Sequence, residues 1–242
     1  MASHKKFNRT GAIAQINHIE RNIKNSSNPD IETARSPQNY SLLDDGRTAM
    51  ERYKTRLQQV HVYGRKDTVT LVGICLTVPA DITEPAQQER FFVAAATWMA
   101  EVYGHENICA ATVHMDEAGR SIGGTKIKPH LHFAFLPVVP NRNHVNSEFA
   151  EKVCAHEIMG KQTGHLAHWH QNLQKYLDEN LDFPARILTG AVKKGGGRNF
   201  SVREIKANTP EWQKAERKRE QERTREADRA RTPGNLEVYD GR

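Results

Sequence analysis

Cysteine is scarce in this chain, and long apolar runs are missing from it. The three cysteines, Cys75, Cys109 and Cys154, lie far apart and form no CxxC pair, so neither a disulfide framework nor a structural zinc site is indicated. No apolar run approaches the roughly 18 residues of a membrane span, and the amino terminus MASHKKFNRTG lacks the apolar core of a signal peptide. We therefore expect a soluble, cytoplasmic protein with reduced thiols.

Positively charged residues outnumber negatively charged ones in this chain. The 242 residues include 35 Lys and Arg against 29 Asp and Glu, which gives a net charge of +6 and a pI near 9.2. This balance suits an anionic partner, nucleic acid first, although many basic proteins bind none. The length allows one sizeable α/β core plus an appendage.

Hydrophobic patterning predicts a mixture of helices and strands. Four segments have helical character, at 11–24, 47–61, 85–104 and about 164–180. Three β-rich segments predict strands, at 68–79, 107–117 and 128–139. We expect an α/β fold of the α+β type, with a mostly antiparallel central sheet and flanking helices. Beyond it, the alternating charges of EWQKAERKREQERTREADRAR predict a charged helical or disordered tail over 209–242.

A histidine pattern lies in the last two predicted strands. The stretch KIKPHLHFAFLPVV places His130 and His132 two residues apart, and side chains at i and i+2 of a strand share a face. The preceding strand ends in VHMDE, so antiparallel pairing brings His114 close to both. A single strand histidine is more often a packing residue, but three converging imidazoles can form a metal site with open positions, which by itself suggests zinc.

Two carboxylates and a helical pair accompany these histidines. Asp116 and Glu117 follow the second predicted strand, and either could orient a histidine, bind the metal or accept a proton. In the first predicted helix, His18 and Arg21 are three residues apart and share a face. Near a metal, such an imidazole could attack a phosphate held by the guanidinium. Alone, HIER is a weak signal, because helix surfaces often contain such pairs.

Taken together, these residues resemble the MobV (Pre/Mob) family of plasmid relaxases, a branch of the HUH endonucleases. The family motif HxDExTPHxH is similar to HMDE and PHLHFAFLP in this chain, and HIER, NPDI and RSPQNY resemble segments near the family's amino terminus. The resemblance covers about residues 10–208 and implies a relaxase domain over 1–208. One departure is the insertion AGRSIGGTKIK, eleven residues where the family has two. We expect it to lengthen a hairpin tip without moving the strands, because loop length costs little free energy.

The resemblance implies an enzyme that nicks one DNA strand at a plasmid origin of transfer. It would stay attached to the 5′ phosphate and later rejoin the strand. The resemblance implies that His114, His130 and His132 bind a divalent cation, Mn²⁺ or Mg²⁺ rather than Zn²⁺, with Glu117 close by.

The resemblance also implies a nucleophile and phosphate contacts. His18 matches the position of the family's nucleophile, and Tyr40 is the rival because most HUH enzymes use tyrosine. Arg21 and Arg35 are expected to hold phosphates. The glycine-rich run GAVKKGGGRNF adds further candidate DNA contacts, with a solvated loop as an equally good interpretation: Lys193, Lys194 and Arg198.

The expected partner is plasmid DNA in single-stranded or hairpin form, because the nick site must be reached unpaired. Family members often continue further, so a homodimer through a C-terminal region is a possible second interaction. Three alternatives stay open. They are a rolling-circle replication initiator or transposase of the HUH class, a DNA-binding module with structural histidines, and, least favoured, a zinc hydrolase acting on a small molecule.

Overall fold

The computed structural model describes residues 2–22, 30–121, 124–142, 148–160 and 164–187. A five-stranded sheet lies at the centre of the unit formed by Met1–Gly119 and Thr125–Gly196, and its four neighbouring pairs are all antiparallel. In spatial order the strands are β1 (Ala2–Asn8), β3 (Val69–Thr77), β7 (His130–Phe135), β4 (Ile108–His114) and β2 (Tyr40–Ser41). The α+β fold with a mostly antiparallel sheet is confirmed.

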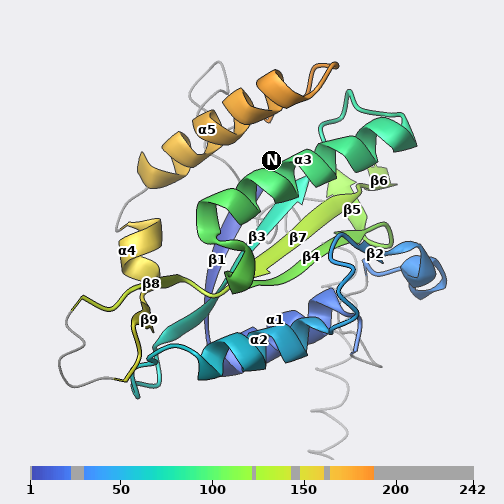
Figure 1. Cartoon of the computed structure of the whole chain (residues 1–242). Coiled ribbons are helices and arrows are strands. Elements are labelled where there is room, and N and C mark those ends of the chain that lie inside the picture. The colour runs from blue at the N-terminus through green and yellow to red at the C-terminus, as the bar shows by residue number, and fades with distance from the viewer. Residues whose placement is uncertain (1, 23–29, 122–123, 143–147, 161–163, 188–242) are drawn as a thin grey trace, which may run out of the picture. The chain divides into compact units, whose positions relative to one another are not determined.

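Helices cover both faces of this sheet (Figure 1). On one face lie α1 (Arg9–Ile19) and α2 (Ala49–Gln58), and on the other lies α3 (Pro85–Tyr103), against which α5 (Gly164–Asn180) packs. The short elements are η1 (Thr33–Gln38), η2 (His105–Asn107) and α4 (Ala155–Met159). Two hairpin-like pairs complete the description: β5 (Ala118–Ser121) with β6 (Gly124–Ile127), and β8 (Val138–Pro140) with β9 (Glu151–Val153).

Strand alternation divides the core into two layers. Leu131 and Phe133 of β7 belong to the apolar cluster under α3. Ala134, on the opposite face, belongs to the cluster under α1 and α2. All six residues of β7 are buried, which fits a central strand covered on both faces. His130 and His132 have the parity of Ala134, so they lie on the α1 face.

The first helix starts and ends for local reasons. Asn8 caps α1, because its side-chain oxygen accepts a hydrogen bond of 3.0 Å from the backbone N–H of Gly11. The helix ends at Ile19, and Arg21 adopts a φ of 54°, which α-helix cannot continue through. The predicted helix over 11–24 therefore differs at both ends. The observed helix begins two residues earlier, after the Asn8 cap, and ends at Ile19, before the left-handed Arg21.

The predicted strands also differ from the observed ones. The predicted strand 128–139 is two strands, β7 and β8, because the chain turns at Leu136 and Pro137 and β8 pairs with β9 instead of the sheet. Proline lacks the N–H that a central ladder requires. Strand β1 was not predicted, since its sequence ASHKKFN is polar and edge strands need only one apolar face.

Some predictions concern residues outside the described ranges. These are the tail over 209–242, the domain boundary at 208 and the contacts Lys193, Lys194 and Arg198. The homodimer through a C-terminal region likewise stays a prediction. Among the described helices, none is both long and apolar enough to cross a membrane.

Candidate metal and nucleophile site

Three strand histidines meet on the α1 face of the sheet. Strands β4 and β7 pair antiparallel with His114 directly opposite His130, and His132 follows two positions along β7. The predicted pairing of these segments is confirmed. The ring centroids of His114 and His132 lie 4.5 Å apart, and those of His114 and His130 lie 5.4 Å apart. The two-residue period of the strands thus gathers imidazoles from two chain segments into one cluster.

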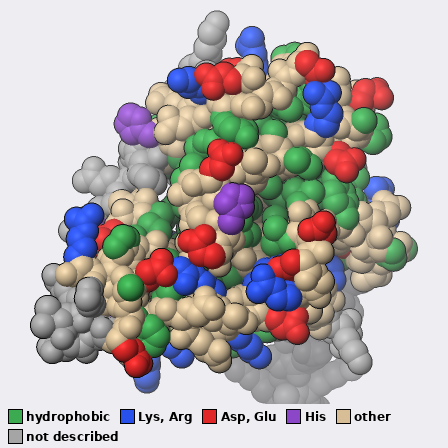
Figure 2. Space-filling view, viewed as in Figure 1, with side chains coloured by type: hydrophobic (Ala, Val, Ile, Leu, Met, Phe, Trp, Pro, Cys, Tyr) green, Lys and Arg blue, Asp and Glu red, His purple; other side chains and the backbone are tan. Residues whose placement is uncertain are grey.

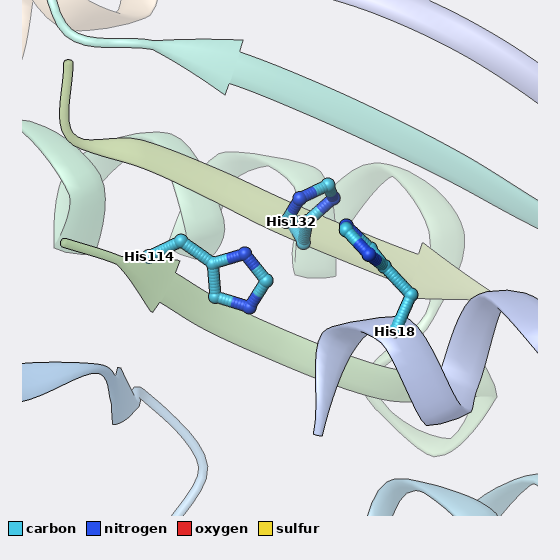
Figure 3. A group of neighbouring side chains, drawn as sticks. All are labelled: His18, His114 and His132. Atoms are coloured by element: carbon cyan, nitrogen blue, oxygen red, sulfur yellow. The ribbon is translucent and has the colours of Figure 1, made fainter. Parts of the chain in front are cut away.

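A fourth histidine joins the cluster from helix α1 (Figure 3). The ring centroid of His18 lies 5.1 Å from that of His132 and 5.6 Å from that of His114. Its Nε2 lies 3.5 Å from Oε1 of Glu117. Helix α1 packs on β3 and β4 through buried Ile16 and Ile19, and this packing points the last turn of the helix at the cluster.

Arg21 links the helix end to the cluster. Its Nη2 donates to Oδ1 of Asp116 at 2.6 Å and to Oε1 of Glu117 at 3.0 Å, and it lies 2.9 Å from Nδ1 of His114. Its Nη1 donates to the carbonyl of His18 at 3.0 Å. One guanidinium thus ties the backbone of α1 to both carboxylates.

The two adjacent carboxylates have different surroundings. Asp116 is fully buried and accepts hydrogen bonds from Arg21, from Oγ of Ser36 at 2.6 Å and from Nδ2 of Asn39 at 2.9 Å. Glu117 faces the histidines, with Oε2 lying 3.4 Å from Nε2 of His130. Strand parity alone would place Asp116 on the same face as His114. However, β4 ends at His114 and the chain turns, so Glu117 lies there instead.

The buried imidazoles are held neutral. Burial, and then the charge of Arg21, lowers the pKa of His114 to about 4. Burial, followed by the neighbouring His114 and His130, lowers the pKa of His132 well below its usual value. Burial also lowers the pKa of His18, with Glu117 acting in the opposite direction. Neutral imidazole is the form that binds a metal or acts as a nucleophile.

The carboxylates are held charged. Burial by itself would raise the pKa of Glu117, but its interactions with His130, and then with His18 and Arg21, lower it to about 2. Burial opposes ionisation of Asp116 as well, but its donors hold the pKa of that carboxyl well below its usual range. Both groups are therefore anions at neutral pH.

The donor atoms fit a divalent cation. Groups whose ligand atoms lie within 4.8 Å of one another are His114–Glu117–His130, Cys75–His130–His132 and His18–His114–His132. Nε2 of His130 and Nε2 of His132 are 3.2 Å apart, close to the roughly 3 to 3.4 Å that two bonds of about 2.1 Å to one ion would impose. The Lys128 carbonyl lies 3.0 Å from Nδ1 of His130, so it can accept the proton there and leave Nε2 free as a ligand.

The other predicted site residues lie further out. Tyr40 pairs with Val113 on β4, and its ring packs in the apolar cluster on the α3 face, near Glu89. Arg35 is half-buried in η1, and its Nε has no hydrogen-bond partner among the described residues. A cavity of about 460 Å³ adjoins the cluster and is lined in part by Arg21, Asn39 and Tyr40.

Three residues of the site were not singled out from the sequence. Ser36 and Asn39 hold Asp116, and the only signal for them was their place in the segment RSPQNY. Cys75 lies opposite His132 in the β3–β7 ladder. No sequence pattern could identify it, because the register between these strands is a long-range property.

Comparison with solved structures identifies the class of fold. The Mn-bound crystal structure of the MobM relaxase domain (MOBV; Mob_Pre) with plasmid oriT DNA at pH 5.5 aligns with a TM-score of 0.63 and 24% identity. The alignment covers 86% of this chain and 98% of that one. The corresponding structure at pH 6.8 gives 0.62 and 23%, covering 85% and 96%. At these identities the likeness concerns the fold, which is that of a relaxase domain.

Sequence comparison gives the family. The family model for the plasmid recombination enzyme, Mob_Pre, matches residues 1–183, and the chain belongs to this family. A plasmid recombination enzyme of Lactiplantibacillus plantarum is 30% identical over 212 residues, covering 85% of this chain and 52% of the relative. A type 2 enzyme of Staphylococcus aureus is 31% identical over 132 residues, covering 50% and 28%. The chain thus spans about half or less of the length of these curated relatives.

Proposed function

We propose that this chain is a relaxase domain that nicks one strand of plasmid DNA at an origin of transfer and stays joined to the 5′ phosphate through His18. The observation that carries the proposal is the position of His18, which projects from α1 into a cluster of three strand histidines and Glu117. Family membership supports the reaction class. The Mn-bound MobM complexes with oriT DNA support the substrate and the cation.

The surroundings of His18 suit a nucleophile. Nε2 faces Oε1 of Glu117 at 3.5 Å, and Nδ1 faces Nη1 of Arg21 at 3.3 Å. Glu117 holds the proton on Nε2, which leaves the lone pair on Nδ1. An incoming phosphate oxygen takes over the hydrogen bond of Arg21 Nη1, and the released lone pair of Nδ1 attacks phosphorus. The P–N bond forms as the P–O3′ bond breaks, and the leaving 3′ oxygen takes a proton from water. Rejoining reverses these steps.

His114, Glu117, His130 and His132 would hold a divalent cation, Mn²⁺ first, Mg²⁺ second and Zn²⁺ least favoured. When bound, it supplies Lewis-acid polarisation of the scissile phosphate, worth several kcal/mol in general. Asp116 does not join this set in the proposal. Its oxygens are taken by Arg21, Ser36 and Asn39, so it acts as the anchor of Arg21.

The distribution of Lys and Arg supports contacts with single-stranded or hairpin DNA from two parts of the chain, the surroundings of the site and residues 188–242. Figure 2 shows Lys and Arg side chains lying among Asp and Glu on the face in view, with no patch of one sign. Residues 188–242, in contrast, contain fourteen Lys and Arg against nine Asp and Glu. We propose that phosphate contacts come from Arg21 and Arg35 beside the site and from Lys193, Lys194 and Arg198.

The test uses supercoiled plasmid carrying the cognate origin, with Mn²⁺, and the wild type, His18→Ala and Tyr40→Phe. We expect loss of nicking and of the covalent adduct in His18→Ala alone. The adduct should also be acid-labile, because a phosphoramidate hydrolyses in acid whereas a tyrosine phosphodiester survives.

Each of the other outcomes would support a different interpretation. An acid-stable adduct that disappears in Tyr40→Phe would keep the nicking activity but overturn the histidine nucleophile. If the wild type binds the origin DNA and never nicks it, the chain is a DNA-binding module. Nicking at a replication origin rather than an origin of transfer would indicate a rolling-circle initiator.

A further inference from the structure

Strand β3 contributes a thiol to the histidine cluster. Cys75 lies directly opposite His132 in the β3–β7 ladder, and directly opposed residues of an antiparallel pair point to the same face. That face is the α1 side, since the neighbouring Ile74 belongs to the cluster under α3. Sγ of Cys75 and one ring nitrogen each of His130 and His132 lie within 4.8 Å of one another.

Two of the three overlapping ligand groups of this cluster lie on opposite sides of β7. On the β4 side, His114 and Glu117 complete a set with His130 that contains a carboxylate. On the β3 side, Cys75 completes a set with His130 and His132 that contains a sulfur. The histidines of β7 stand between the two, because β7 is the central strand.

We propose that Cys75, His130 and His132 form a second metal site, selective for soft or borderline cations such as Zn²⁺ and Cd²⁺. Carboxylate ligands suit Mn²⁺ and Mg²⁺, whereas thiolate selects zinc-like ions. Three protein ligands with an open fourth position are a usual zinc arrangement, with Zn–S bonds of about 2.3 Å and Zn–N bonds of about 2.0 to 2.1 Å. Because the two sets share imidazoles, occupation of one excludes the other.

Thiolate is the form of cysteine that binds a metal, so binding displaces a proton. An arriving cation replaces the thiol proton, which is released to solvent, and the metal–sulfur bond forms in its place. The competition between cations depends on the proposed Mn²⁺ or Mg²⁺ centre, but the thiolate site itself does not depend on DNA nicking.

Cd²⁺ titration of the metal-free chain, followed by ultraviolet absorption, tests the site. We expect a sulfur-to-cadmium charge-transfer band that saturates at one equivalent in the wild type and disappears in Cys75→Ser and Cys75→Ala. Cys154→Ser is the matched control, because Cys154 lies at the start of α4, away from the cluster, and it should keep the band. Circular dichroism establishes that each variant is folded.

A second measurement tests the competition. Bound Mn²⁺, followed by its electron paramagnetic resonance, should be released by about one equivalent of Zn²⁺ from the wild type. The ratio of Zn²⁺ to Mn²⁺ affinity should fall at least about tenfold in Cys75→Ser, because removing a group that supports a metal site lowers metal affinity by about 10- to 100-fold. A band that persists in both Cys75 variants, or an unchanged affinity ratio, overturns the proposal. A Cys75-dependent band in a chain that nicks no DNA supports this site and removes the proposed function instead.

Discussion

Strand β7 presents different chemistry to its two faces. Towards α3 it turns Leu131 and Phe133 into an apolar cluster, and towards α1 it turns His130 and His132 into a polar one. Both faces are buried to a similar extent. The difference shows that burial on one side stabilises the sheet, while burial on the other lowers the pKa of His132 and so favours its neutral imidazole. The same six residues carry stability and chemistry because their side chains alternate.

The largest expected effect is a loss of stability on the apolar face of β7. Phe133→Ala should lower the free energy of unfolding by about 3–5 kcal/mol, because it removes a fully buried ring and leaves a cavity. His132→Gln should cost less stability and should instead weaken Mn²⁺ binding. Urea unfolding and a metal titration of both variants measure this contrast. Equal losses of stability, with metal binding unaffected in both, would remove the distinction between the faces.

A smaller effect separates the two carboxylates beside the histidine face. Asp116→Asn should lower the free energy of unfolding by about 1.5–3 kcal/mol, the range for hydrogen bonds to a charged group. Its carboxylate anchors Arg21, Ser36 and Asn39 in a buried place. Glu117→Gln is the matched control: it should lose less stability and more affinity for Mn²⁺. The assignment fails if Glu117→Gln is the less stable variant and Asp116→Asn the poorer metal binder.

The smallest effect is the pH dependence of the histidine face. The pKa of His114 is about 4 in the folded chain and near 6.5 when unfolded. Between these values the unfolded state binds more protons, so stability falls as the pH falls. For His114 alone the loss is about 1 kcal/mol on going from about pH 7 to about pH 5.5. Urea unfolding of chelator-treated protein measures it, and His114→Gln should flatten the slope. If the slope is the same in His114→Gln, a different titrating group causes it.

The sequence predicted the parts of this fold that depend on local pattern. Helix α3 was expected over 85–104 and spans Pro85–Tyr103, because its apolar periodicity is strong and Gly104, at a φ of 86°, ends it. The β4–β7 pairing followed from two β-rich segments and a turn-rich insertion. Parity then placed His114, His130 and His132 on one face without any structural information.

The remaining site residues depend on long-range packing. His18 reaches the cluster because α1 packs on β3 and β4, and HIER alone carries no information on that packing. The roles of Asp116 and Glu117 differ because β4 ends before them, so strand parity no longer applies. Cys75 enters through the register of β3 against β7. These three features are tertiary, and local propensity cannot predict them.

The insertion between β4 and β7 has a practical consequence. His114 and His130 stay directly opposite each other although eleven residues, including β5 and β6, separate Glu117 from Pro129. The ladder therefore fixes the register, and lengthening the connection adds little to the cost of closing it. This hairpin is a suitable attachment point for protein engineering. A fluorescent or affinity label inserted into this connection should leave the pairing of His114 with His130 unchanged.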